Sequence, residues 1–184
     1  MRQLRFVVLP LAVLLASNLQ SQTTRREVIR ATTPELDAKG LDPKVPNSIA
    51  VSTQFERIIV LRCKNQADLL AEIEGQVARE KIQNAVILSG IGSAMSTHYH
   101  MVTNREFPSK NTYFETKVTS ADIIGMNGYI LSGKVHAHIT FANPEKSYGG
   151  HLESGTKVFT FAIVTIGVLP DNIPVGRFDD KTLR

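Results

Sequence analysis

Three histidines in one short stretch form the strongest chemical signal in this sequence. His136 and His138 stand two residues apart in an alternating segment, and His151 follows the pair Gly149-Gly150. Side chains two residues apart in a strand share one face, so the first two imidazoles can reach a single ion. We expect the glycine pair to form a sharp turn that brings His151 back to them. Because neutral imidazole is the commonest protein ligand for transition metals, the three histidines are the predicted metal site.

Zinc is the expected ion, although copper, nickel and iron also accept imidazole ligands. Three imidazoles leave a coordination position for water, a small-molecule ligand or another side chain. His98 and His100 form a second His-x-His and are candidates for that position. Protons compete for the same nitrogens, so we expect affinity to fall below about pH 6.5. The other interpretation is a polar strand face and a turn, without a bound metal.

No other catalytic arrangement stands out in the sequence. Nothing resembles a Ser-His-Asp triad, and the single cysteine, Cys63, has no histidine near it in the sequence. Cys63 follows an apolar, strand-like run, so we expect a buried structural thiol, and a lone cysteine excludes an intrachain disulfide. Whether the chain is an enzyme stays open. The enzymatic alternative is a metal-dependent reaction on a small molecule, with Glu153 as a candidate general base or else a solvated loop acid.

The hydrophobic pattern predicts a sheet with one principal helix to position these residues. Strand patterns cover residues 55–63, 84–89, 96–102, 113–118, 121–131, 134–141 and 157–168. The helical pattern follows Asn65, the predicted N-cap, and continues to Ile82. Residues 90–93 are expected to form a bend between two strands. One helix among these strands indicates an α+β fold with a mainly antiparallel sheet.

The first residues of the chain resemble an export signal. Arg2 and Arg5 precede an apolar run, Phe6 to Ala16, that is too short to cross a bilayer as a helix. We expect residues 1–21 to be removed, which makes the protein periplasmic or secreted and leaves no stable membrane insertion. The other interpretation is an uncleaved membrane anchor.

The rest of the chain divides into two parts. Residues 22–51 lack periodicity and are expected to form a linker or an extended arm, and residues 52–184 form one domain. Since two of the 21 basic side chains lie in the signal, the mature chain keeps 19 of them against 17 acidic ones. This balance does not favour nucleic-acid binding. Self-association is favoured instead, because the segment 157–168 is apolar on both faces.

Several motifs resemble the PPC domain (plant and prokaryote conserved domain) over about residues 52–180. The most specific match is His136-Ala137-His138 with Gly149-Gly150-His151-Leu152. The other matching segments are Ile59-Val60-Leu61-Arg62, Asp68-Leu69-Leu70, Leu88-Ser89-Gly90-Ile91-Gly92-Ser93, Ile124-Gly125-Met126-Asn127-Gly128 and Gly155. The resemblance implies an α+β fold, a homotrimer and metal binding at the three histidines.

Plant members of that family carry AT-hook motifs, but this chain has no Arg-Gly-Arg-Pro core, so DNA binding does not carry over. His98, His100 and the export signal also depart from the family pattern. The cupin family is a competitor because it too has His-x-His on a strand. Its motif places a glutamate where this chain has Ala142 and Asn143, and the helix between the early strands fits it poorly.

Overall fold

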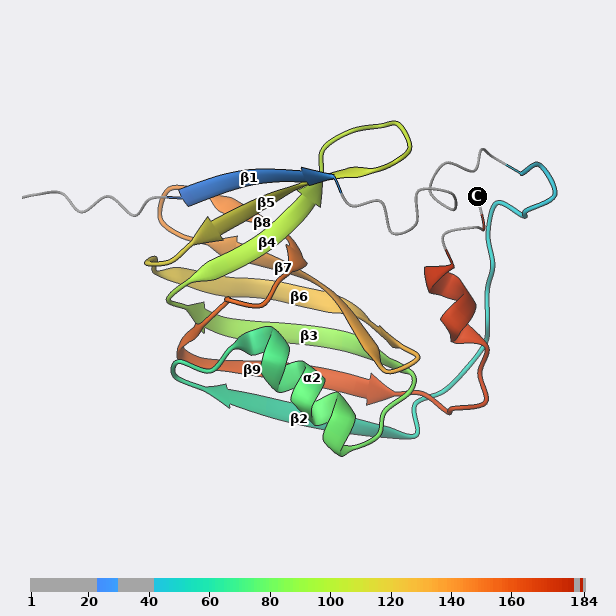
Figure 1. Ribbon diagram of the computed structural model, residues 1–184. Helices are drawn as coiled ribbons and strands as arrows, with labels where there is room; N and C mark the ends of the chain where they lie inside the picture. Colours follow the sequence, from blue (N-terminus) through green and yellow to red (C-terminus); the bar gives the residue numbers. More distant parts are fainter. Residues whose placement is uncertain (1–22, 30–41, 181–182, 184) are drawn as a thin grey trace, which may run out of the picture.

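Nine strands form one antiparallel sheet in the order β1-β5-β4-β8-β7-β6-β3-β9-β2 (Figure 1). The computed structural model of the 184-residue chain describes residues 23–29, 42–180 and 183. Its strands are β1 (Thr23–Ile29), β2 (Arg57–Lys64), β3 (Ala85–Ala94), β4 (Thr97–Val102), β5 (Lys110–Thr116), β6 (Ala121–Leu131), β7 (Lys134–Ala142), β8 (Ser147–Leu152) and β9 (Val158–Val168). The helices among these residues are α2 (Leu69–Arg79) and a short 3-10 helix, η1 (Val175–Asp179). The expected α+β fold is confirmed in outline, with more strand than predicted.

The helix α2 covers one face of the sheet and closes the hydrophobic core. Leu69, Ile73 and Val77 recur at helical spacing, and all three are buried. The prediction that Asn65 caps the helix is wrong. Asp68 is the N-cap and accepts a hydrogen bond from the Ala71 amide at 3.2 Å. Asn65 instead donates its side-chain amide to a carbonyl oxygen of β9, because the chain still turns between β2 and α2 at that point.

The opposite face of the sheet carries large apolar side chains that no described helix covers. On β7, Ala137 and Ile139 belong to the core, so the residues that alternate with them lie on this opposite face. Figure 1 shows α2 on one side of the sheet only. The exposed apolar residues of β2, β3, β6 and β9 are Ile58, Val60, Leu88, Ile91, Ile124, Tyr129, Phe159 and Phe161.

The segment 90–93 is part of β3 and not a bend between two strands. β3 continues to Ala94, and its pairing with β9 shifts register between Ile87 and Ser89 and again between Gly92 and Ala94. Gly92 has a φ of 150°, and a Cβ there would stand 2.2 Å from the carbonyl oxygen of Phe161. The glycine therefore permits a close approach of two strands, which sequence reasoning mistook for a turn.

The N-terminal region contains a strand that the sequence did not predict. β1 pairs with β5 along its full length, from Thr23 opposite Thr116 to Ile29 opposite Lys110. The expected signal peptide, residues 1–21, lies outside the described residues. In the part of the chain that is described, no helix combines the length and the apolarity needed to span a membrane.

Candidate metal centre

The hairpin of β7 and β8 positions the three predicted ligands. Its turn lies at Asn143-Pro144, where the Asn143 side-chain oxygen accepts hydrogen bonds from the amides of Glu145 at 3.1 Å and Lys146 at 2.9 Å. The predicted turn at Gly149-Gly150 is wrong, since both glycines lie inside β8.

Both glycines are needed for a different reason. A Cβ on Gly149 would stand 2.0 Å from the carbonyl oxygen of Ile139 on β7, and one on Gly150 would stand 2.3 Å from that of His100 on β4. The strand β8 is thus held very close to both of its neighbours. This close approach, and not a bend, brings His151 to the other histidines.

The sheet register places three histidines in one row across adjacent strands. His151 on β8 is the direct partner of His138 on β7 and of His100 on β4. Direct partners in an antiparallel sheet project from the same face. His136 lies two residues before His138 and therefore shares this face, which is the one turned away from α2.

Nitrogen atoms of His136, His138 and His151 lie within 4.8 Å of one another. The rings of His136 and His138 are nearly parallel, at 7° with centroids 5.4 Å apart. The His151 ring stands at 79° to both of them, with centroids 4.7 and 5.4 Å away. His136 and His138 are exposed and His151 is half-buried. The structure therefore brings together all three predicted ligands.

The surroundings of the site favour neutral imidazoles. Burial, followed by the nearby rings of His100 and His136, lowers the pKa of His151 to about 4. Burial and the same two neighbours also lower the pKa of His138. Metal ligation requires an unprotonated nitrogen, so protons compete less at these two rings than at free histidine. For His138 and His151, we therefore expect protons to displace the metal only at a pH lower than about 6.5.

The two additional histidines have different surroundings. His100 stacks on His151, with centroids 4.5 Å apart, and its Nδ1 lies 2.6 Å from an oxygen of Glu153. The Nδ1 of His98 lies 2.6 Å from the carbonyl oxygen of Ser154. Of these two candidates for the remaining position, His100 contacts the cluster and His98 does not belong to it. Glu153, the candidate base, lies against His100.

A further carboxylate was missed by sequence reasoning. Asp179, in η1, has an oxygen 3.9 Å from Nδ1 of His136, and both side chains are about half exposed. The two residues are far apart in the sequence, and no local pattern connects them.

Cys63 is buried as expected, and burial together with the charge of Glu72 raises the pKa of its thiol to about 11. A thiol of that kind is protonated and unreactive at neutral pH.

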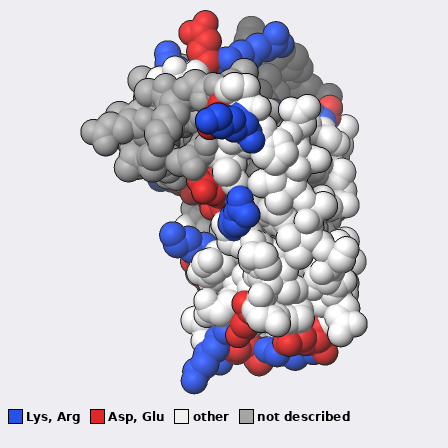
Figure 2. Space-filling model, turned by 90° about the vertical axis from the view of Figure 1, so that its right-hand side faces the viewer, with Lys and Arg blue, Asp and Glu red and all other residues white. Residues whose placement is uncertain are grey.

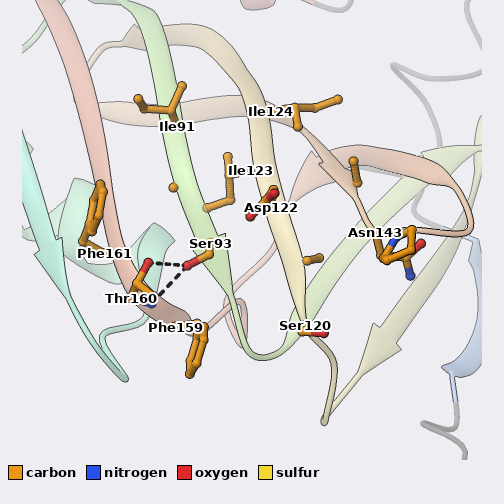
Figure 3. Close-up of a pocket in the computed structure, with 14 residues that line it drawn as sticks. Ile91, Ser93, Ser120, Asp122, Ile123, Ile124, Asn143, Phe159, Thr160 and Phe161 are labelled. Atoms are coloured by element: carbon orange, nitrogen blue, oxygen red, sulfur yellow. Dashed lines mark hydrogen bonds between the residues drawn. The ribbon is translucent and has the colours of Figure 1, made fainter.

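An open groove of about 780 Å³ lies on the sheet away from the histidines (Figure 3). It is lined by residues of β3, β6 and β9 and by the start of the loop after β7, and none of the five histidines contributes to it. Its walls include Ile91, Ile124 and Phe159, while the Ser93 hydroxyl bonds to that of Thr160 at 2.6 Å. The groove is therefore a largely apolar part of the exposed sheet face.

Solved structures of other proteins share this fold. A protein of Salmonella enterica is 21% identical over 65% of this chain and 82% of its own, with a TM-score of 0.55. A plant- and prokaryote-conserved (PPC) protein of Pyrococcus horikoshii is 22% identical over 70% and 94%, with a TM-score of 0.53. A metal-containing protein of Archaeoglobus fulgidus is 23% identical over 66% and 86%, with a TM-score of 0.52.

No curated protein matches the chain. The model of the Plants and Prokaryotes Conserved (PCC) domain, however, matches residues 50–170, which is most of the domain and includes all three predicted ligands. The strands and the histidine motif that suggested this family thus lie within the matched region. The chain belongs to the Plants and Prokaryotes Conserved domain family.

Proposed function

We propose that this chain is a metal-binding module in which His136, His138 and His151 hold one divalent transition-metal ion, with zinc as the expected ion. The observation that carries the proposal is the convergence of three ligand nitrogens within 4.8 Å on two paired strands. The A. fulgidus relative is described as metal-containing, which agrees with this assignment. Such an ion would supply a coordination position for water or a small-molecule ligand.

The chemistry of the donor set also supports the proposal. His151 and His138 have lowered pKa values, so their lone pairs are available at neutral pH. Asp179 lies 3.9 Å from Nδ1 of His136, beyond hydrogen-bond distance, so a small movement would let it accept a hydrogen bond from a ligating imidazole.

The test is titration calorimetry on chelator-stripped protein. We expect wild type to bind zinc more tightly than about 10 μM, and the substitutions His136→Ala, His138→Ala and His151→Ala each to weaken binding at least about tenfold. His98→Ala is the matched control, because His98 points to the Ser154 carbonyl and lies outside the cluster. Absence of binding by wild type, or equal binding by all three variants, would refute the proposal.

A homotrimer is the second part of the proposal. The exposed apolar residues of β2, β3, β6 and β9 lie on the sheet face opposite α2. Figure 2 shows Lys, Arg, Asp and Glu at the top and bottom of the molecule and along its left and centre, while the side turned away from α2, on the right, is largely without them. Contiguous apolar surface of this kind favours burial against other protein surface.

Export and the absence of a DNA partner complete the proposal. The basic start and the apolar run from Phe6 to Ala16 support export. N-terminal sequencing of the secreted protein should give a sequence that begins near Gln22, and uncleaved protein in the cytosol would contradict export.

The balanced charge supports the lack of DNA binding, and a salt-dependent mobility shift of duplex DNA at submicromolar protein would contradict that expectation.

A further inference from the structure

A second group of metal-ligating side chains lies on the other side of His151. Ligand atoms of His100, His151 and Glu153 lie within 4.8 Å of one another. In the row formed by β7, β8 and β4, His151 stands between His138 and His100. Its ring is edge-on to the first and stacked, at 29°, on the second. One imidazole is therefore shared by two clusters of ligands.

We propose that His100, His151 and Glu153 form a second binding position for a divalent transition-metal ion, adjacent to that of His136, His138 and His151. The full site then holds two ions with the imidazole of His151 between them. The inference extends the proposed function and rests on it for the role of His151 alone, because His100 and Glu153 take no part in the first position.

The imidazole ring has the chemistry that this arrangement requires. It carries two nitrogens, and a neutral ring has one proton on one of them. Ligation of one ion uses the unprotonated nitrogen. Ligation of a second ion displaces the remaining proton, which is released to solvent, and leaves an imidazolate bound to both ions. No oxidant or reductant takes part.

The contact between His100 and Glu153 supplies the other two ligands. Nδ1 of His100 and Oε1 of Glu153 are 2.6 Å apart, a distance at which they share one proton. Zinc bonds of about 2.0–2.2 Å at tetrahedral angles place two ligands of one ion about 3.4 Å apart, so the pair must open by about 0.8 Å. The ion replaces the shared proton, which passes to Nε2 of His100 and keeps that ring neutral. Glu153 follows the end of β8, and its flexible side chain can make this adjustment.

The burial of the pair favours an ion over a simple hydrogen bond. The side chains of His100 and Glu153 are only 12% and 17% exposed. A carboxylate held away from water is stabilised by a nearby positive charge, and a divalent ion provides more charge than a shared proton. The ring of Tyr113, 4.9 Å from that of His100, adds apolar surroundings on the far side. The mixed nitrogen and oxygen ligands suit zinc and copper.

The experiment counts ions on the purified full-domain protein, freed of metal by chelation and then loaded with excess zinc. We expect elemental analysis after desalting to give about two zinc ions per wild-type chain. Glu153→Gln and His100→Phe should each reduce the count to about one, and the second of these keeps a stacked ring next to His151. His136→Ala should also leave about one, and the His98→Phe control should leave two.

Copper loading gives a second readout. If His100 and Glu153 had a purely structural role, their substitution would leave the copper signal unchanged. Two copper(II) ions joined by one imidazolate couple magnetically, so the wild-type electron paramagnetic resonance signal should be largely lost. Glu153→Gln should restore the signal of a single uncoupled ion. Wild type that binds one ion, which is lost with His136, His138 or His151 but kept in His100→Phe and Glu153→Gln, would overturn the second position and leave the proposed function intact. Wild type that binds no ion would overturn both.

Discussion

The imidazole of His138 stands edge-on to that of His151, its direct cross-strand partner, with the ring centroids 5.4 Å apart. Burial and neighbouring imidazoles lower the pKa of both rings, that of His151 to about 4. We therefore expect zinc binding at about pH 5.5 to release fewer than three protons per ion, because His151 is already neutral there. Calorimetry in buffers of different ionisation enthalpy measures this number. Release of three protons at that pH would contradict the prediction.

The same lowered pKa predicts how the metal-free protein responds to acid. His151 has a folded-state pKa below that of an unfolded chain, about 6.5, so the unfolded chain binds more protons between about pH 6.5 and pH 4. The free energy of unfolding should therefore fall as the pH falls through that window. Urea unfolding at several pH values measures it, and His151→Gln should show a smaller decrease. An equal decrease in wild type and variant would assign the effect to other groups.

Substitution of a single glycine in β8 should disturb the site from within the strand. A Cβ on Gly149 would stand 2.0 Å from the Ile139 carbonyl oxygen, so Gly149→Ala must push β8 away from β7. We expect a loss of about 2 kcal/mol or more in the free energy of unfolding, together with weaker zinc binding.

The control for that substitution is Gly125→Ala, in β6. A Cβ at Gly125 would meet no atom within 4 Å, so we expect a change within about 0.5 kcal/mol. Urea unfolding of the two metal-free variants measures the difference. Equal stability of the two would show that β8 can move without cost.

This glycine pair also shows where sequence reasoning reaches its limit. Alternation along β7 correctly placed His136 and His138 on one face, because that pattern is local. Gly149-Gly150 has the composition of a turn, and nothing local distinguishes a turn from a strand that lies very close to its neighbours. The deciding contacts are those of the two glycines with the carbonyl oxygens of Ile139 and His100, which belong to other strands and are not visible in the local sequence.

The same limit applies to the partners of the histidines. His98 and His100 form a pattern that the sequence made visible, but only the register of β4 against β8 selects His100. The contact between Asp179 and His136 depends on where η1 packs after the last strand. Local patterns thus predicted the helix, most strands and the shared face of His136 and His138, while pairings between distant strands decided the rest.

A half-buried carboxylate connects the helix to the loop that follows the candidate site. Asp68 accepts hydrogen bonds from the amide of Ala71 at 3.2 Å and from that of Gly155 at 2.7 Å. Burial alone would raise its pKa, but these hydrogen bonds and the charge of Lys157 lower it overall. We expect Asp68→Ala to reduce the free energy of unfolding by about 2–3 kcal/mol at neutral pH, through loss of the helix cap and of the loop contact.

The control for Asp68 lies on the same helix. Glu74 is exposed on α2, and Glu74→Ala replaces it with a good helix former, so its effect should stay within about 0.5 kcal/mol. Thermal or urea unfolding at pH 7 compares the two. Because the pKa of Asp68 is lowered in the folded state, its contribution should disappear only in acid, as the pH falls through that pKa. An Asp68→Ala variant as stable as Glu74→Ala would contradict the assignment.

The exposed face of β3, β6 and β9 should bury itself in a trimer. Ile91 is 55% exposed there and lines the apolar groove beside Ile124 and Phe159. Light scattering at micromolar concentration should give about three times the mass of one chain. Ile91→Asp should give a folded monomer, because a charge at an exposed position costs little in one chain but is costly in a closed apolar interface.

Val102→Asp is the matched control for Ile91→Asp, since Val102 is 63% exposed on β4, five strands away from β9 in the sheet. It should leave the trimer unchanged. A monomeric wild type, or an Ile91→Asp variant that remains trimeric, would show that this face does not hold the subunits together.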